Sequence, residues 1–67
     1  MPAYNRDRDL PILGVMWRYF PTEREALQFA RWAERVTKRS SRPCKAFVSV
    51  AEDHPAAERF EVKVRNW

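Results

Sequence analysis

One amphipathic segment, flanked on both sides by alternating segments, is the feature that most restricts the folds open to this chain. Residues 22–38 place apolar side chains along one face at the period of an α-helix, and charged side chains along the other. Thr22 and Glu25 have the spacing of a capping box, so a helix should begin at about residue 23 and end at about residue 38. Its expected core face consists of Ala26, Phe29, Ala30, Ala33, Val36 and Thr37, flanked by Leu27 and Trp32.

Three further segments predict strands. Residues 10–20 are rich in apolar, β-branched and aromatic side chains, and Pro11 and Gly14 within them favour an edge strand. Residues 44–50 and 59–67 alternate between apolar and polar side chains, which is typical of half-buried strands. The last segment contains neither proline nor glycine, as expected of a central strand.

The resulting order, β-α-β-β, predicts an α+β fold. We expect two layers, with one amphipathic helix packed on one face of a three-stranded sheet, because only one helix is available to cover the apolar sheet face. The expected strand order is 1-3-2, with the third strand antiparallel to both neighbours. This arrangement resembles the first half of a ferredoxin-like unit in architecture only, which implies no function. We expect a flexible N-terminal arm over residues 1–10 and a single β-α-β-β domain over residues 11–67.

Composition argues against several functional classes. The 67 residues contain one cysteine, Cys44, so no disulfide can form within the chain. Cys44 and the single histidine, His54, are too few for a four-ligand zinc site. His54 lies close to Glu52 and Asp53, but no second catalytic base or orienting partner accompanies them. We therefore expect no enzymatic activity, no metal and no cofactor. Cys44 should be a small buried side chain at the start of its strand.

The chain also lacks features of export and membrane insertion. Residues 1–10 contain no apolar stretch of the kind found in signal peptides. The longest apolar run, residues 11–17, is much shorter than the roughly 20 residues that span a bilayer. Together with the single thiol, these features favour a cytoplasmic location and no membrane partner.

The net charge of +4 is concentrated in the predicted helix and the turn after it. Residues 23–45 carry seven cations against three glutamates, and "KRSSRPCK", residues 38–45, holds four of these cations. Such a cluster predicts weak, sequence-independent contact with RNA or single-stranded DNA. The predicted nucleic-acid-binding residues are Arg31, Arg35, Lys38, Arg39, Arg42 and Lys45. Alternatively, the cluster is a solvated helix end, where the helix dipole opposes an anion.

The sheet face away from the helix is a second candidate surface. If Leu13, Val15 and Trp17 face the helix, the outward residues are Met16, Arg18, Lys45, Phe47, Ser49, Glu61, Lys63, Arg65 and Trp67. Aromatic rings interleaved with cations suit a single-stranded nucleic acid, because rings stack on bases and cations contact phosphates. The alternative is a protein–protein interaction module, or a homodimer, formed through this face with no nucleic-acid role. Its predicted interface residues are Met16, Phe47 and Trp67.

Overall fold

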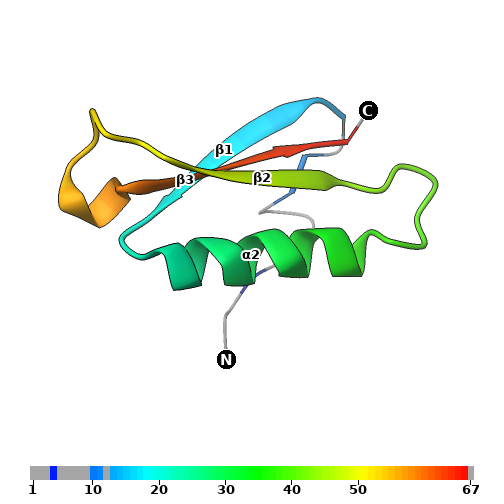
Figure 1. Cartoon of the computed structure of the whole chain (residues 1–67). Helices are drawn as coiled ribbons and strands as arrows, with labels where there is room; N and C mark the ends of the chain where they lie inside the picture. Colours follow the sequence, from blue (N-terminus) through cyan, green and yellow to red (C-terminus); the bar gives the residue numbers. More distant parts are fainter. Residues whose placement is uncertain (1–3, 5–9, 12, 67) are drawn as a thin grey trace.

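The computed structural model of the protein describes residues 4, 10–11 and 13–66. Its elements are strand β1 (Val15–Phe20), helix α2 (Glu23–Val36), strand β2 (Lys45–Val50), the short 3-10 helix η1 (Ala56–Glu58) and strand β3 (Phe60–Arg65). The strands form one layer, and α2 lies along that layer as a second one (Figure 1). The predicted α+β class, with one helix packed on a three-stranded sheet, is confirmed.

The sheet has the order β1-β3-β2, and β3 is antiparallel to both neighbours, as predicted. The register places one residue from each strand in rows that cross the sheet. Val62 of β3, for example, lies between Arg18 of β1 and Val48 of β2. Because Val62 and Val64 are fully buried, their rows identify the sheet face that α2 covers.

A capping box explains where α2 begins. The Thr22 side-chain oxygen accepts a hydrogen bond from the Glu25 backbone N–H at 3.2 Å. The Thr22 hydroxyl also lies 3.2 Å from the Glu25 carboxylate, to which it donates. The predicted start of the helix at residue 23 is therefore confirmed.

Thr37 ends the helix and joins it to the sheet. Its hydroxyl donates to the Ala33 carbonyl at 2.7 Å, and its oxygen accepts from the Cys44 backbone N–H at 2.9 Å. The helix therefore ends at Val36, slightly before the predicted residue 38, and its last turn is fixed to the chain that enters β2.

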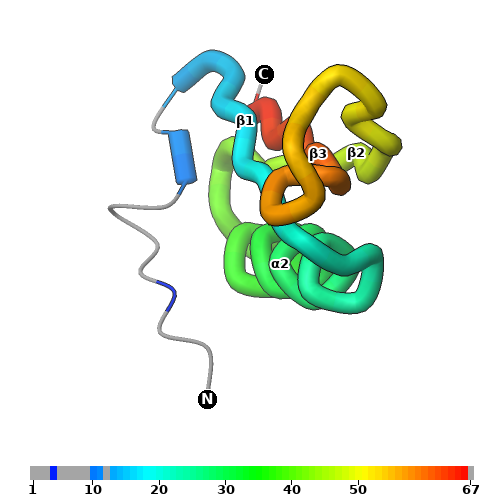
Figure 2. Tube along the Cα trace, turned by 90° about the vertical axis from the view of Figure 1, so that its left-hand side faces the viewer, coloured from blue at the N-terminus to red at the C-terminus, as the bar shows by residue number. Residues whose placement is uncertain are grey.

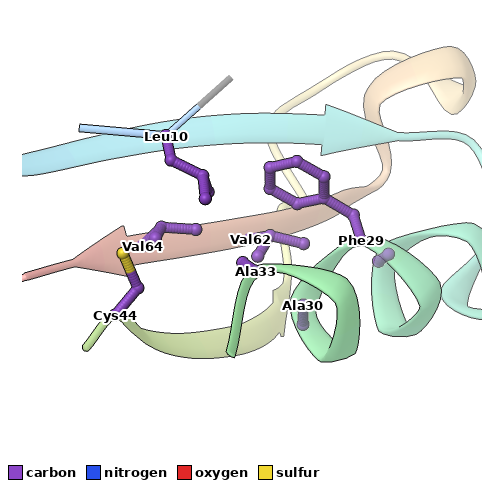
Figure 3. Close-up of a cluster of buried hydrophobic side chains, with 8 residues drawn as sticks. Leu10, Phe29, Ala30, Ala33, Cys44, Val62 and Val64 are labelled. Atoms are coloured by element: carbon purple, nitrogen blue, oxygen red, sulfur yellow. The ribbon is translucent and has the colours of Figure 1, made fainter. Parts of the chain in front are cut away.

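The core lies between α2 and β3 (Figure 3). Three alanines on the buried face of α2 allow the helix to approach the sheet closely, and Phe29 fills the remaining space between the layers. Cys44 is buried, as predicted. The buried apolar residues are Leu10, Ala26, Phe29, Ala30, Ala33, Cys44, Val62 and Val64.

Asn66 holds the chain before β1 against the end of β3. Its Nδ2 donates to the Pro11 carbonyl at 2.7 Å, and its Oδ1 accepts from the Gly14 N–H at 3.0 Å. Gly14 has φ of 121°, a conformation that favours glycine, so the chain bends at this point. The strand predicted over residues 10–20 is therefore confined to Val15–Phe20.

Two residues of the predicted N-terminal arm are described, and both contact the core. The ring centroid of Tyr4 lies 5.1 Å from those of Phe29 and Trp32, and Leu10 is buried. The remaining residues of the predicted arm lie outside the described part of the chain.

The prediction of which side of the first strand faces the helix is wrong: the inward and outward residues are exchanged. Met16 pairs with buried Val64 and packs against the core, and the Arg18 guanidinium lies 5.2 Å from the Phe29 ring centroid. Both faces of this strand carry large apolar side chains, so alternation alone does not identify the buried one. Arginine is compatible with the buried side because its aliphatic stem packs while its charge contacts a ring. The outward residues of β1 are Val15, Trp17 and Tyr19.

Candidate functional site

In the described part of the chain, α2 packs on one face of the sheet (Figure 2), and the opposite face is here called the open face. The connection between β2 and β3 contacts the open face at one end, where His54 stacks on Tyr19. The open face consists of three rows that cross β1, β3 and β2 in turn. The residues of these rows are Val15, Arg65 and Lys45, then Trp17, Lys63 and Phe47, then Tyr19, Glu61 and Ser49.

The middle row places a cation between two exposed aromatic rings. Trp17 is 50% exposed and Phe47 is 49% exposed, and both lie opposite Lys63 in the register. Because adjacent strands lie about 4.8 Å apart, the two aromatic residues are separated by roughly 10 Å across Lys63. Two flat apolar surfaces and one ammonium group are thus available to the same bound molecule.

The row beside it adds two more cations. Arg65 lies opposite Lys45, and the Arg65 guanidinium carbon is 5.4 Å from the Phe47 ring centroid. The Arg65 Nε is buried and has no hydrogen-bond partner among the residues that the structure describes. The contact with the Phe47 ring therefore positions the positive charge of Arg65 beside the middle row.

The loop between α2 and β2 continues this positive charge beyond the end of the sheet. This loop lies at the right in Figure 1. Together with the segment before β1, it borders an open cavity of about 320 Å³. The described residues that line this cavity are Leu13, Ser41, Arg42, Pro43, Lys45 and Asn66. We call this region, together with Arg65, the basic end of the sheet.

The opposite end of the sheet is acidic. The connection between β2 and β3, at the left in Figure 1, carries Glu52, Asp53 and Glu58, and the last row of the open face has Glu61 at its centre. A second cavity of about 340 Å³ lies here. Its lining residues are Val50, Ala51, Glu52, Asp53, His54 and Glu61.

Tyr19 and His54 form a stacked pair at this acidic end. Their ring centroids are 4.3 Å apart, and the planes differ by 16°. The Tyr19 hydroxyl donates to Glu61 at 3.2 Å, while His54 Nδ1 lies 3.4 Å from a Glu58 carboxylate oxygen. Partial burial raises the pKa of Tyr19 above its usual 10.0, and the charge and hydrogen bond of Glu61 and the charge of Glu58 add to this effect.

The six cations predicted from the sequence lie in different places. Arg42 and Lys45 are brought together at the basic end. Arg31 and Arg35 flank a separate cavity of about 260 Å³ on the outer side of α2, with Gln28 and Trp32. Lys38 and Arg39 are exposed in the turn after α2.

The three residues predicted for an interface are also separated. Phe47 lies on the open face, Met16 lies on the side facing α2, and Trp67 lies outside the described residues. Sequence reasoning placed Trp17 on the wrong face because the phase of β1 was ambiguous. Lys63 and Arg65 were expected on the open face, but only the register shows that they lie beside Trp17 and Phe47.

Two kinds of feature are absent from the part of the chain that the structure describes. Within residues 4, 10–11 and 13–66, no group of three or more histidine, cysteine or acidic side chains is arranged to hold a metal ion. The same described residues contain no helix with the length and apolar character needed to cross a membrane.

Comparison with protein-family models, curated proteins and solved structures finds no match to this chain.

Proposed function

We propose that the protein is a small non-enzymatic binding domain that contacts RNA or single-stranded DNA weakly and without sequence preference. The observation that carries this proposal is the middle row of the open face, where Lys63 lies between exposed Trp17 and Phe47. Aromatic side chains stack on unpaired bases of any identity, and neighbouring cations neutralise the phosphates that connect those bases.

The open face suits a single strand better than a duplex. Its aromatic rings require bases that are free to leave a stack, and the bases of a duplex are not free. The face presents few groups suited to reading base edges, since among its described residues the hydroxyl and carboxylate side chains, Tyr19, Glu61 and Ser49, are confined to the last row. Binding should therefore depend on stacking and charge rather than on base sequence.

The charge distribution restricts the contact to one part of the sheet. Four cations lie together at or beside the basic end, namely Arg42, Lys45, Lys63 and Arg65. The carboxylates at the other end would repel a phosphate backbone. We therefore place the bound strand over the middle row and the basic end, and away from Tyr19 and His54.

The cations of the helix and the following turn that were predicted from the sequence contribute less to the proposed binding surface. Arg31 and Arg35 lie on the outer side of α2, so the sheet and the helix separate them from the open face. Lys38 and Arg39 lie in the turn before the basic end and are available to extend the contact. We propose Arg42 and Lys45 as the principal members of the predicted set.

A fluorescence anisotropy titration over a range of salt concentrations tests this function. The probes are dye-labelled single-stranded oligouridine and oligothymidine, with a labelled duplex as comparison. Neutralisation of about four phosphates gives a slope of roughly −3 in a plot of log affinity against log salt. A wild-type protein that binds neither single strand at low ionic strength would contradict the proposal.

A homodimer formed through the open face is a second candidate. Rotation by 180° about an axis parallel to the middle row would place Arg65 of one copy opposite Glu61 of the second copy, and would cover Trp17 and Phe47. The same rotation brings two Lys63 side chains together, which disfavours it. Sedimentation of the free protein separates the two candidates: a dimer that Phe47→Asp dissociates supports this one, and a monomer at high concentration opposes it.

We also propose a cytoplasmic location. The single thiol, Cys44, is buried and free, and it packs as part of the apolar core. Reducing conditions suit such a thiol.

A further inference from the structure

The cavity at the basic end combines apolar and cationic walls. Leu13 and Pro43 provide apolar surface, Arg42 and Lys45 provide positive charge, and Ser41 provides a hydroxyl. Leu13 is 63% exposed, the largest exposed fraction among the large apolar side chains of the described residues. An exposed leucine beside two cations is unfavourable for packing but is suited to a ligand with both an apolar and an anionic part.

Both walls of this cavity are fixed to the fold. On one side, Asn66 holds Pro11 and Gly14, the described residues that flank Leu13. On the other side, buried Cys44 and its hydrogen bond to Thr37 anchor the end of the loop. A cavity with anchored walls loses little conformational entropy when a ligand binds.

We propose that this cavity binds one nucleotide of the single strand. The nucleobase lies against Leu13 and Pro43, and the phosphate is held by Arg42 and Lys45. The volume of about 320 Å³ is at the lower end of the range for small-molecule sites, which starts near ~300 Å³, and this fits one nucleotide rather than a larger ligand. This inference rests on the proposed function, because it identifies the ligand class for one part of the same surface.

The position of Lys45 connects the cavity to the open face. Lys45 lines the cavity and is also the first residue of β2, where it lies opposite Arg65. Arg65 in turn contacts Phe47. A strand with one nucleotide in the cavity would therefore continue past Arg65 toward Phe47 and Trp17, so the cavity fixes the starting point of the bound strand.

The cationic and apolar walls of the cavity together favour a ligand that has both a phosphate and a nucleobase. Two cations alone would bind inorganic phosphate, and two apolar side chains alone would bind a nucleoside. Because both are present, a nucleoside monophosphate should bind more tightly than either of its parts. Uridine 5′-monophosphate, uridine and inorganic phosphate are suitable probes of this difference.

The test is a titration of ¹⁵N-labelled full-length protein with each probe, followed by amide chemical shifts. We expect uridine 5′-monophosphate to shift the amides of Leu13, Gly14 and the non-proline residues of 41–45, with an affinity at least about tenfold higher than that of phosphate or uridine. Leu13→Ser and Arg42→Gln should each weaken this binding several-fold, whereas Arg31→Gln, on the outer side of α2, should not. The substituted side chains are exposed, so each variant should keep the wild-type spectrum elsewhere.

The outcomes separate this inference from the proposed function. If an oligonucleotide shifts residues around Trp17 and Phe47 while the mononucleotide leaves the cavity unchanged, the nucleotide site is overturned and the open-face proposal stands. Equal affinities for phosphate and uridine 5′-monophosphate would also overturn it, since the apolar wall would then contribute nothing. If neither the oligonucleotide nor the mononucleotide shifts any resonance, both proposals fail.

Discussion

The guanidinium carbon of Arg65 lies 5.4 Å from the ring centroid of Phe47, on the neighbouring strand and one row away on the open face. Such a contact contributes about 0.5–1 kcal/mol at an exposed site. Its larger consequence is positional, because it holds a positive charge beside an exposed ring. A bound strand can therefore place a base on Phe47 and the adjoining phosphate near Arg65.

Replacing the exposed rings should weaken binding of single strands without unfolding the protein. Stacking contributes roughly 1–3 kcal/mol per base, so Phe47→Leu or Trp17→Leu should lower affinity for oligouridine by about 5-fold to 150-fold. Leucine keeps an apolar side chain at positions that are about half exposed, so stability should change little.

Leu27→Ala is the control for these variants. Leu27 is also partly exposed, but it lies on α2 rather than on the open face. An equal loss of affinity in Leu27→Ala and in Phe47→Leu, measured by anisotropy, would show that stacking on the open face is not the cause.

Asn66→Asp should destabilise the protein. Aspartate cannot donate to the Pro11 carbonyl, and loss of a partner for a buried polar group costs about 1–3 kcal/mol. The free energy of unfolding, measured by urea denaturation, should fall by that amount, whereas Ser49→Ala on the exposed side of β2 should change it little. Equal stabilities of Asn66→Asp and the wild type would mean that this side chain does not hold the segment before β1.

Tyr19 should lose its phenolic proton at a higher pH than an ordinary tyrosine. Partial burial and the neighbouring Glu61 raise its pKa above 10.0 in the folded protein. The folded state therefore retains this proton where the unfolded state has lost it. The resulting contribution to stability is complete below pH 10.0 and is lost as the pH rises through the folded-state pKa.

Ultraviolet titration of tyrosinate in a Tyr4→Phe background measures the pKa of Tyr19 alone. Glu61→Gln should move this pKa back toward 10.0, because it removes a negative charge and a charged hydrogen-bond acceptor. Glu23→Gln, at the start of α2, should leave it unchanged. A Tyr19 pKa that does not respond to Glu61→Gln would contradict the contact between these residues.

The helix and the strand order could be predicted from the sequence because each depends on a strong local pattern. The capping box at Thr22 marks the start of the helix, and the buried residues of the helix recur at a spacing that strands do not have. The proline-free third strand indicated its central position, and pairing on both sides confirms it. These signals come from residues that are close together in the chain.

The candidate site depends instead on pairings between distant residues. Trp17, Lys63 and Phe47 form one row only because of the register between three strands. The phase of β1 was ambiguous because Met16 and Phe20 make its buried side as apolar as its exposed side. Arg18 favoured the wrong choice, since its contact with Phe29 has no signature in the sequence.

The most direct test of the central claim compares two variants that remove the same charge from different places. Arg42→Gln with Lys45→Gln removes two cations from the basic end, and Arg31→Gln with Arg35→Gln removes two from the outer side of α2. The affinity of each double variant for oligouridine is measured over a range of salt concentrations. We predict that the first pair reduces the salt slope by about 1.4 and lowers affinity, and that the second pair leaves the slope near the wild-type value. Equal losses in the two variants, or a larger loss from the α2 pair, would contradict binding at the basic end of the open face.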